Sequence, residues 1–260
     1  MSGSSYYVEP ALYDTIYGDV TNDVAPHVAS MRAADGPALE VCCGNGRLLI
    51  PTLEAGVECE GLDVDPAMLA DLRAKLAARA LAATLYEADM RTFDLPRRYA
   101  LVAIRFNSFL HNLTQADQLA TLAACRRHLR PGGRLELTVF HPGAAKLVEL
   151  AAGEQLAKEV QAGPRRVRLY DRAEDDRVEQ VRRVFRRIEI AEDGRLVTER
   201  ATEFVLRYVF KPEMELLLRV AGFARWAVQA LGAGVRDAAT GSAAGPLQEG
   251  DILTWTAWND

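Results

Sequence analysis

A glycine turn and a carboxylate carry the clearest chemical signal in this chain of 260 residues. The apolar run 38–41 leads into a turn that contains Gly44 and Gly46, and Asp63 follows seventeen positions after Gly46. Such a turn lets the backbone approach one end of a nucleoside closely, while an acid at the end of the next strand accepts hydrogen bonds from ribose hydroxyls. The spacing therefore predicts a nucleoside site.

Two further polar turns follow later predicted strands. Residues 87–90, Glu-Ala-Asp-Met, combine acids with a soft apolar side chain, which suits the edge of an adenine ring. Residues 105–108, Arg-Phe-Asn-Ser, come directly after the next strand. Together these matches weigh against the alternative that the glycine turn is a plain connection between a strand and a helix.

A nicotinamide dinucleotide is the competing ligand. Its fingerprint has a third glycine, which allows close helix packing beneath a pyrophosphate. Leu49 occupies that position here, within a run of apolar residues. A ligand with no pyrophosphate at the turn fits this sequence better.

The elements that must position these residues alternate between apolar runs and helical stretches from residue 38 to 140, which is typical of a parallel sheet covered by helices. Asp65-Pro66 opens one helix, because Asp accepts from first-turn amides and Pro tolerates the first position. Thr114 and Asp117 open another. The predicted strands are 38–42, 58–62, 83–87, 99–105 and 134–140.

Residues 143–210 interrupt this alternation. A helix is predicted over about 143–160, followed by an arginine-rich segment. Apolar residues in 178–188 have a helical period, but Asp193-Gly194 between two apolar runs favours a hairpin. We interpret the arginine-rich segment as strands.

A helix at 212–221 and strands near 223–229 and 251–258 complete the pattern, with a Gly/Ala-rich loop at 232–250. We predict an α/β fold with a Rossmann-like, seven-stranded, mostly parallel sheet, helices on both faces, and an inserted antiparallel β segment that covers the active site. The predicted domains are an N-terminal helical lid (1–31), the Rossmann-like core (32–142 and 211–260), and an inserted segment for substrate binding and dimerisation (143–210).

Charge, hydropathy and cysteine usage argue against a nucleic-acid-binding, membrane or metal-binding protein. The net charge is −5 and charged residues make up 26%, so we expect no nucleic-acid partner. No apolar run approaches the roughly 20 residues that cross a bilayer, and the N-terminus has no secretion signal, so we expect no membrane partner. Adjacent Cys42 and Cys43 and the absence of a C-x-x-C pair predict buried thiols in a reducing cytoplasm and no metal.

Four motifs together resemble those of class I S-adenosylmethionine-dependent methyltransferases: 40–47, 61–69, 87–90 and 129–140. The run 107–111, Asn-Ser-Phe-Leu-His, is similar more narrowly to small-amine N-methyltransferases of the glycine N-methyltransferase and dTDP-aminosugar N,N-dimethyltransferase type. One departure is Cys42, where the family usually has glycine. Ubiquinone/menaquinone methyltransferases also carry a Cys-Cys pair there, so the resemblance implies a slightly tighter pocket.

The resemblance implies S-adenosyl-L-methionine as cofactor. Glu40 and the two glycines would surround its methionine portion, and Asp63 would bind its ribose. The adenine would lie beside Val64 and Met68. The implied cofactor-binding residues are Tyr17, Glu40, Gly44, Asn45, Gly46, Asp63, Val64, Met68, Asp89, Met90 and Phe106.

Methyl transfer to an amine needs alignment and, at neutral pH, loss of a proton from that amine. His111 is the candidate base, because histidine titrates in the useful range. The alternative is that it caps a loop or donates to a backbone carbonyl. Asn107 is the second candidate catalytic residue, as a hydrogen-bonding group for substrate or cofactor, and its alternative is a simple turn former.

Tyr13 and Tyr17 lie one helical turn apart in a segment that resembles the lid helix of these enzymes, so both rings could close over the sulfonium. The alternative is ordinary packing of an amphipathic helix. Interleaved acids indicate that most arginines of 143–210 form a solvated face. The alternative is an anion site in which Arg165, Arg166, Arg168 and Arg172 recognise a carboxylate or phosphate. Exposed strand edges there could also pair two copies into a homodimer. The predicted substrate-binding residues are Tyr13, Asn107, His111, Tyr170 and Tyr208.

We therefore expect a cytoplasmic methyltransferase that acts on a small molecule of specialised metabolism, most readily at an amine nitrogen. Three alternatives stay open. The acceptor could be a hydroxyl that His111 deprotonates or orients, or a carbon nucleophile. The chain could also keep the cofactor fold without transferring methyl, as a cyclase or a binding subunit.

Overall fold

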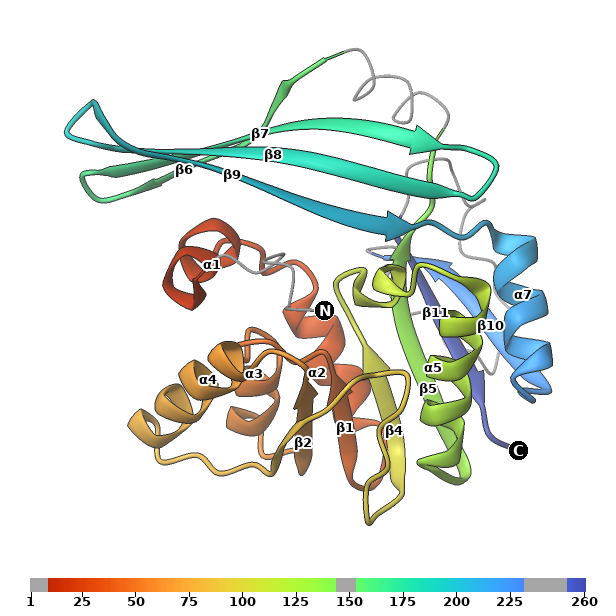
Figure 1. The fold of residues 1–260 in the computed structure, drawn as a ribbon. Helices are drawn as coiled ribbons and strands as arrows, with labels where there is room; N and C mark the ends of the chain where they lie inside the picture. The colour runs from red at the N-terminus through yellow and green to blue at the C-terminus, as the bar shows by residue number, and fades with distance from the viewer. Residues whose placement is uncertain (1–8, 144–152, 232–251) are drawn as a thin grey trace. The chain divides into compact units, whose positions relative to one another are not determined.

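Contacts divide the chain into two units, each with its own sheet (Figure 1). The computed structural model describes residues 9–143, 153–231 and 252–260. The smaller unit combines Met1–Val20 with Pro142–Tyr208, and the larger combines Thr21–His141 with Val209–Asp260.

The larger unit is built on a seven-stranded sheet in the order β10-β11-β5-β4-β1-β2-β3 (Figure 1). Strands β1 to β5 pair in parallel, and β11 is antiparallel to both of its neighbours. This order confirms the predicted Rossmann-like, mostly parallel sheet. The strands are β1 (Ala38–Val41), β2 (Cys59–Asp63), β3 (Leu85–Glu87), β4 (Tyr99–Ile104), β5 (Leu129–Phe140), β10 (Arg225–Ala230) and β11 (Ile252–Trp258).

The centre of this sheet is buried on both faces. Every residue of β1, β2 and β4 is buried, as expected for parallel strands that helices cover on two sides. Helices α3 and α4 pack against β2, while α5 packs against β5 and α7. The helical elements of this unit are α2 (Val24–Arg32), α3 (Leu49–Glu54), α4 (Pro66–Ala78), the 3-10 helix η1 (Ser108–His111), α5 (Gln115–Arg127) and α7 (Lys211–Val220).

Both predicted helix starts are confirmed. The Asp65 side chain accepts from the backbone N–H of Ala67 at 2.8 Å, in the first turn of α4. The Thr114 hydroxyl accepts from the N–H of Asp117 at 3.0 Å, in the first turn of α5. Both caps satisfy amides that lack a partner inside the helix, and they set the direction in which each loop before the helix leaves the sheet.

The smaller unit is an antiparallel sheet in the order β6-β7-β8-β9, with helix α1 packed on it. The predicted antiparallel segment is thus confirmed. Residues Leu12 and Ile16 of α1 form an apolar cluster with side chains of β7 and β8. The elements are α1 (Pro10–Tyr17), β6 (Gln155–Ala162), β7 (Arg165–Asp176), β8 (Val181–Glu192) and β9 (Arg195–Arg207).

The turn between β8 and β9 confirms the predicted hairpin. Asp193 has φ 49° and Gly194 has φ 80°, so both turn residues adopt the left-handed backbone that a two-residue hairpin loop requires. The helix expected over 143–160 is wrong from Gln155 onward, because that stretch pairs with β7 as strand β6. Residues 144–152 lie outside the described chain, as does the predicted loop 232–250.

None of the helices in the described residues is both long enough and apolar enough to cross a membrane.

Candidate active site

The glycine turn after β1 is a tight loop with several left-handed residues. Cys42 has φ 60°, Gly44 φ 54° and Gly46 φ 91°. A Cβ atom on Gly46 would lie 2.3 Å from Leu72 Cδ1, so only glycine lets α4 pack this closely against the loop. A Cβ on Gly44 would meet no heavy atom within 4 Å. The loop is therefore closed behind Gly46 and has room in front of Gly44.

Asp63 ends β2 and holds this loop. Its Oδ2 accepts from the N–H of Gly44 at 2.7 Å and its Oδ1 from the N–H of Asp65 at 2.9 Å. Burial raises the pKa of the Asp63 carboxyl, while the two N–H donors oppose that rise. A carboxylate offers about four acceptor positions, so each oxygen can still take a ribose hydroxyl.

Glu40, on β1, brings a second buried acid to this part of the sheet, with 3% of its surface exposed. Its Oε2 is buried and accepts no hydrogen bond from any described residue. His27 of α2 faces this oxygen, with Nε2 3.4 Å from Oε2. An uncompensated buried carboxylate is costly unless a cation pairs with it. The α-ammonium group of a methionine fits that need.

Residues at the start of α4 show how the base of a nucleoside could be received. Val64 has 58% of its surface exposed directly after β2, whereas Met68 is buried. Asn45, in the glycine turn, donates from Nδ2 to Asp71 Oδ2 at 3.2 Å. The exposed Val64 side chain is therefore one that a flat ring could contact, whereas Met68 belongs to the core.

Met90 joins three loops of the site through its sulfur. Cys42 Sγ lies 3.8 Å from Met90 Sδ, and Asn112 Nδ2 lies 3.6 Å from the same atom. Asn112 is held in turn by the Thr121 hydroxyl, which donates to its Oδ1 at 2.9 Å. The structure thus brings the predicted Met90 against the turn after β1.

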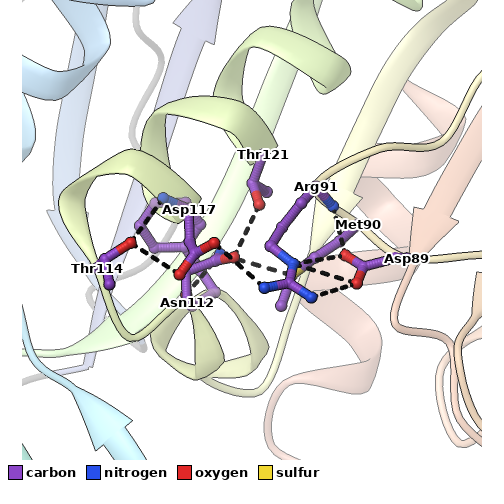
Figure 2. Close-up of polar contacts among 8 residues, drawn as sticks. Asp89, Met90, Arg91, Asn112, Thr114, Asp117 and Thr121 are labelled. Atoms are coloured by element: carbon purple, nitrogen blue, oxygen red, sulfur yellow. Dashed lines mark hydrogen bonds and ion pairs between the residues drawn. The ribbon is translucent and has the colours of Figure 1, made fainter. Parts of the chain in front are cut away.

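Asp89 is clamped by an arginine that sequence reasoning missed. Arg91 donates to Asp89 Oδ2 from Nη2 at 2.6 Å and to Asp117 Oδ1 from Nη1 at 3.1 Å. Figure 2 shows Arg91 between the two acids, with Asn112 and Thr121 alongside. This hydrogen bonding lowers the pKa of the Asp89 carboxyl. The clamp ties the loop after β3 to the start of α5.

The loop after β4 is braced by β5. Phe106 and Asn107 have φ 55° and 64°, an uncommon backbone for residues other than glycine. The N–H of Phe106 donates to Thr138 Oγ1 at 2.9 Å, and the N–H of Phe140 donates to Asn107 Oδ1 at 2.7 Å. Asn107 therefore acts as a turn former through its oxygen, and its amide nitrogen is the atom left for a ligand.

His111 ends η1, one turn beyond this loop. Burial lowers the pKa of its imidazole to about 4. The ring is consequently neutral near pH 7, the form that can accept a proton. Its predicted role as a base stays a prediction.

The predicted tyrosines all belong to the smaller unit. The rings of Tyr13 and Tyr17 lie 4.8 Å apart, on one side of α1, and Arg186 Nη1 donates to the Tyr17 hydroxyl at 2.8 Å. The Arg187 guanidinium lies over the Tyr170 ring, with Cζ 4.2 Å from the ring centre. Tyr208 is buried just after β9. The lid and substrate roles of these residues stay predictions.

Within the larger unit, the structure brings the predicted cofactor residues to the carboxyl ends of β1 to β4. Sequence reasoning missed His27 and Arg91, and it noted Arg105 only as part of the polar turn 105–108 without giving it a role. The signal in the sequence that could have pointed to such residues is a polar residue within an apolar run. Arg105 follows the apolar strand β4, and Glu136, its partner at 2.5 Å, interrupts the apolar strand β5.

Comparisons with known proteins agree with this geometry. Residues 38–133 match the model of the methyltransferase domain family. A dTDP-3-amino-3,4,6-trideoxy-alpha-D-glucopyranose N,N-dimethyltransferase from Streptomyces venezuelae is 32% identical over 117 residues, which are 45% of this chain and 48% of that protein. A dTDP-3-amino-3,6-dideoxy-alpha-D-glucopyranose N,N-dimethyltransferase from Streptomyces fradiae is 33% identical over 47% of this chain and 49% of its own length. The chain spans about half the length of these curated relatives.

Among solved structures, the SAM-bound amino pentose methyltransferase CalS10 from Micromonospora echinaspora has a TM-score of 0.72 at 25% identity, covering 98% of this chain and 99% of its own. Streptomyces venezuelae DesVI has a TM-score of 0.74 at 22% identity, over 97% and 99%, and shares the fold. The resemblance to class I S-adenosylmethionine-dependent methyltransferases is confirmed.

Proposed function

We propose that this chain binds S-adenosylmethionine and transfers its methyl group to an amine nitrogen of a small molecule. One observation carries the proposal: the open turn at Gly44, Asp63 and the uncompensated carboxylate of Glu40 lie at the ends of neighbouring strands. Together they offer room, a diol acceptor and a partner for an ammonium group. The confirmed resemblance supports this choice of cofactor.

The bound cofactor would supply a methyl group that its sulfonium charge has already activated. The chain's own residues would then provide alignment, which can lower a barrier by about 7–11 kcal/mol. Glu40 would hold the ammonium group and Asp63 the ribose. Met90 and the clamped Asp89 would lie at the edge of the adenine ring. These contacts fix the cofactor at both ends, so its methyl group points in one direction.

His111 and Asn107 would serve the acceptor. An amine must lose its proton before or during attack, and a neutral imidazole is able to take it. The pKa of His111, about 4, keeps the ring neutral near pH 7, and it also makes the imidazole a weaker base than an ordinary histidine. Asn107 would donate from Nδ2, because its Oδ1 is already bonded to β5. This division of roles is specific to the observed hydrogen bonds.

For the acceptor we propose an amino sugar carried on a nucleotide. The two curated relatives are named for dTDP-linked amino sugars, and CalS10 is described as an amino pentose methyltransferase. The acceptor pocket itself, with Tyr13, Tyr170 and Tyr208, stays part of the proposal. The three-part domain division and a homodimer are also part of the proposal. A cytoplasmic location is proposed as well, and the four free thiols support it.

Two measurements test the proposal. Calorimetry should detect binding of S-adenosylhomocysteine, and labelled cofactor should transfer its methyl group to a dTDP-amino sugar but not to the matching dTDP-sugar that carries a hydroxyl in place of the amine. Transfer to the hydroxyl sugar instead would indicate an O-methyltransferase. Tight binding without transfer to either acceptor would favour the non-transferring alternative, and no binding would overturn the proposal.

A further inference from the structure

A chain of buried polar groups runs behind the cofactor-binding acid Glu40. His27 of α2, Arg105 after β4 and Glu136 of β5 are all buried. Arg105 Nε lies 3.0 Å from His27 Nδ1, and Arg105 Nη2 lies 2.5 Å from Glu136 Oε2. On its other side, His27 Nε2 faces Glu40 Oε2 at 3.4 Å. The order of the groups is therefore Glu136, Arg105, His27 and Glu40.

The far end of this chain is firmly held. Glu136 Oε1 accepts from the Ser30 hydroxyl at 2.6 Å and from Arg134 Nε at 2.8 Å. Although burial opposes it, the neighbouring Arg105 and Arg134 charges lower the pKa of Glu136 to about 2. Glu136 is thus an anion that fixes the Arg105 guanidinium in one orientation.

Arg105 in turn decides which nitrogen of His27 carries the hydrogen. A guanidinium can only donate hydrogen bonds, so Nδ1 of His27 must accept from Arg105 Nε. A hydrogen on Nδ1 would set two donors against each other. The single ring hydrogen therefore lies on Nε2 and is directed at Glu40.

We propose that His27 is a positioning residue that holds the Glu40 carboxylate for the α-ammonium group of the cofactor. This inference rests on the proposed function. The 3.4 Å separation is slightly beyond a standard N–H···O distance, so a shift of a few tenths of an ångström as the ammonium group binds would complete the hydrogen bond. His27 would then set the direction of the Glu40 lone pairs without touching the cofactor.

His128 shows what a purely structural histidine looks like in the same unit. It is also buried, but both of its ring nitrogens bond to backbone: Nε2 accepts from the N–H of Leu95 at 2.8 Å, and Nδ1 lies 2.8 Å from the carbonyl oxygen of Ala124. His128 Nε2 also lies 3.6 Å from the exposed Asp94 carboxylate. The ring nitrogens of His27 face side chains, one of which is the acid that the site needs, and no backbone hydrogen-bond partner is seen for them in the part of the chain that the structure describes. His128 is therefore the matched control.

The test compares two ligands that differ only in the part that Glu40 would bind. S-adenosylhomocysteine has the ammonium group, and methylthioadenosine has the same nucleoside and sulfur without it. His27→Phe should weaken the binding of S-adenosylhomocysteine by about 10- to 150-fold, the range expected when a hydrogen bond to a charged group is lost. It should leave methylthioadenosine unchanged. His128→Phe should lower thermal stability and leave both affinities unchanged.

A second variant and a spectroscopic measurement test the same inference if His27→Phe does not fold. His27→Gln has an amide that can accept from Arg105 and donate to Glu40, and it should restore most of the affinity for S-adenosylhomocysteine. Proton–nitrogen correlation spectra of the wild-type chain should show the His27 hydrogen on Nε2. A hydrogen on Nδ1, or equal losses for both ligands in His27→Phe or His27→Gln, would overturn the inference. If the wild-type chain binds neither ligand, the proposed function itself has failed.

Discussion

Acids in the two sheets of this protein meet different partners. In the seven-stranded sheet, Glu40 and Asp63 are buried and face an imidazole and backbone N–H groups rather than arginines or lysines, although Glu136 of the same sheet pairs with Arg105. In the four-stranded sheet, basic side chains lie against acids on the same or the neighbouring strand. The pairs there include Arg165–Glu192, Arg168–Glu159, Arg172–Glu174, Arg182–Asp175, Arg183–Glu203, Arg186–Asp171 and Arg187–Glu199.

This difference shows where a charged ligand can be recognised. Paired arginines have little charge left for an anion, and the exposed pairs contribute only about 0–1 kcal/mol each to stability. A buried carboxylate without a cation is costly by itself and is repaid only when a cation binds. The four-stranded sheet is therefore mainly a scaffold of ion pairs, as the interleaved charges predicted, and we propose that Glu40 and Asp63 of the larger unit recognise the ligand.

The largest expected effect is on catalysis in the larger unit. His111→Ala should lower kcat by about 10²–10⁴-fold, the usual range for loss of a general base, with little change in the affinity for S-adenosylhomocysteine. Burial lowers the pKa of His111 to about 4, so the base form is present above that pH and is lost only as pH falls through it. His111 should therefore add no limb to the rate profile between about pH 6 and 8.

Steady-state kinetics across that range check this prediction. Arg183→Gln is the control on the four-stranded sheet and should stay near the wild-type rate, because it disturbs only an exposed ion pair with Glu203. Methylation at the wild-type rate in His111→Ala would remove the residue from the base role.

The second prediction concerns an ion pair of the four-stranded sheet that is buried, whereas most pairs of that sheet are exposed. Arg182 and Asp175 form a two-pronged pair, with both distances 2.8 Å, whose side chains are only 5% and 4% exposed. Asp175→Asn should lower the free energy of unfolding by about 3–5 kcal/mol, because it leaves a buried guanidinium uncompensated. Urea denaturation measures this.

Glu159→Gln is the matched control, because the Arg168–Glu159 pair is 34% and 42% exposed. Its removal should cost less than about 1 kcal/mol. Equal losses in the two variants would mean that burial does not separate these pairs.

A smaller effect is expected on cofactor affinity, and it tests the proposed role of Asp63 at the ribose. Asp63→Ala should weaken S-adenosylhomocysteine by about 1–3 kcal/mol, because hydrogen bonds to a charged acceptor are lost. Since burial raises the pKa of Asp63, the ionised acceptor is fully present above that raised pKa. Affinity should thus be highest near neutral pH and fall as the pH drops through it, at a higher pH than for an ordinary aspartate.

Calorimetry over a pH series measures this dependence. Asp63→Asn should flatten the profile because it cannot titrate. A wild-type affinity that stays constant down to the pKa of a free aspartate, about 3.9, would contradict the assignment of Asp63 to the ribose.

The smallest effect concerns the departure at Cys42. Its φ of 60° is a left-handed backbone that glycine would adopt without strain. Cys42→Gly should change the free energy of unfolding by less than about 1 kcal/mol, since relief of strain and loss of a side chain oppose each other. Cys42→Val should cost about 1–3 kcal/mol, because a branched side chain does not tolerate this backbone. Equal stability of the two variants would show that the loop relaxes instead.

Features that depend on neighbouring residues were predictable from the sequence. The Asp65 and Thr114 caps, the Asp193-Gly194 hairpin and the turn at Gly44 each follow from backbone preferences over a few positions. The alternation of apolar runs was enough to predict the sheet. One local pattern misled: Gln155–Ala162 suits a helix by composition, yet it forms the edge strand of a hairpin because β7 supplies its hydrogen bonds.

The sequence by itself determined the fold class, the positions of the glycine turn and Asp63, and the mixed charge of residues 143–210, because these depend on local spacing and composition. Only the tertiary structure decided which charges are paired, that Arg91 clamps Asp89, and that His27 reaches Glu40 across 13 positions of chain. Each of these contacts joins residues on different elements. Their geometry follows from how helices and strands pack, which no short stretch of sequence specifies.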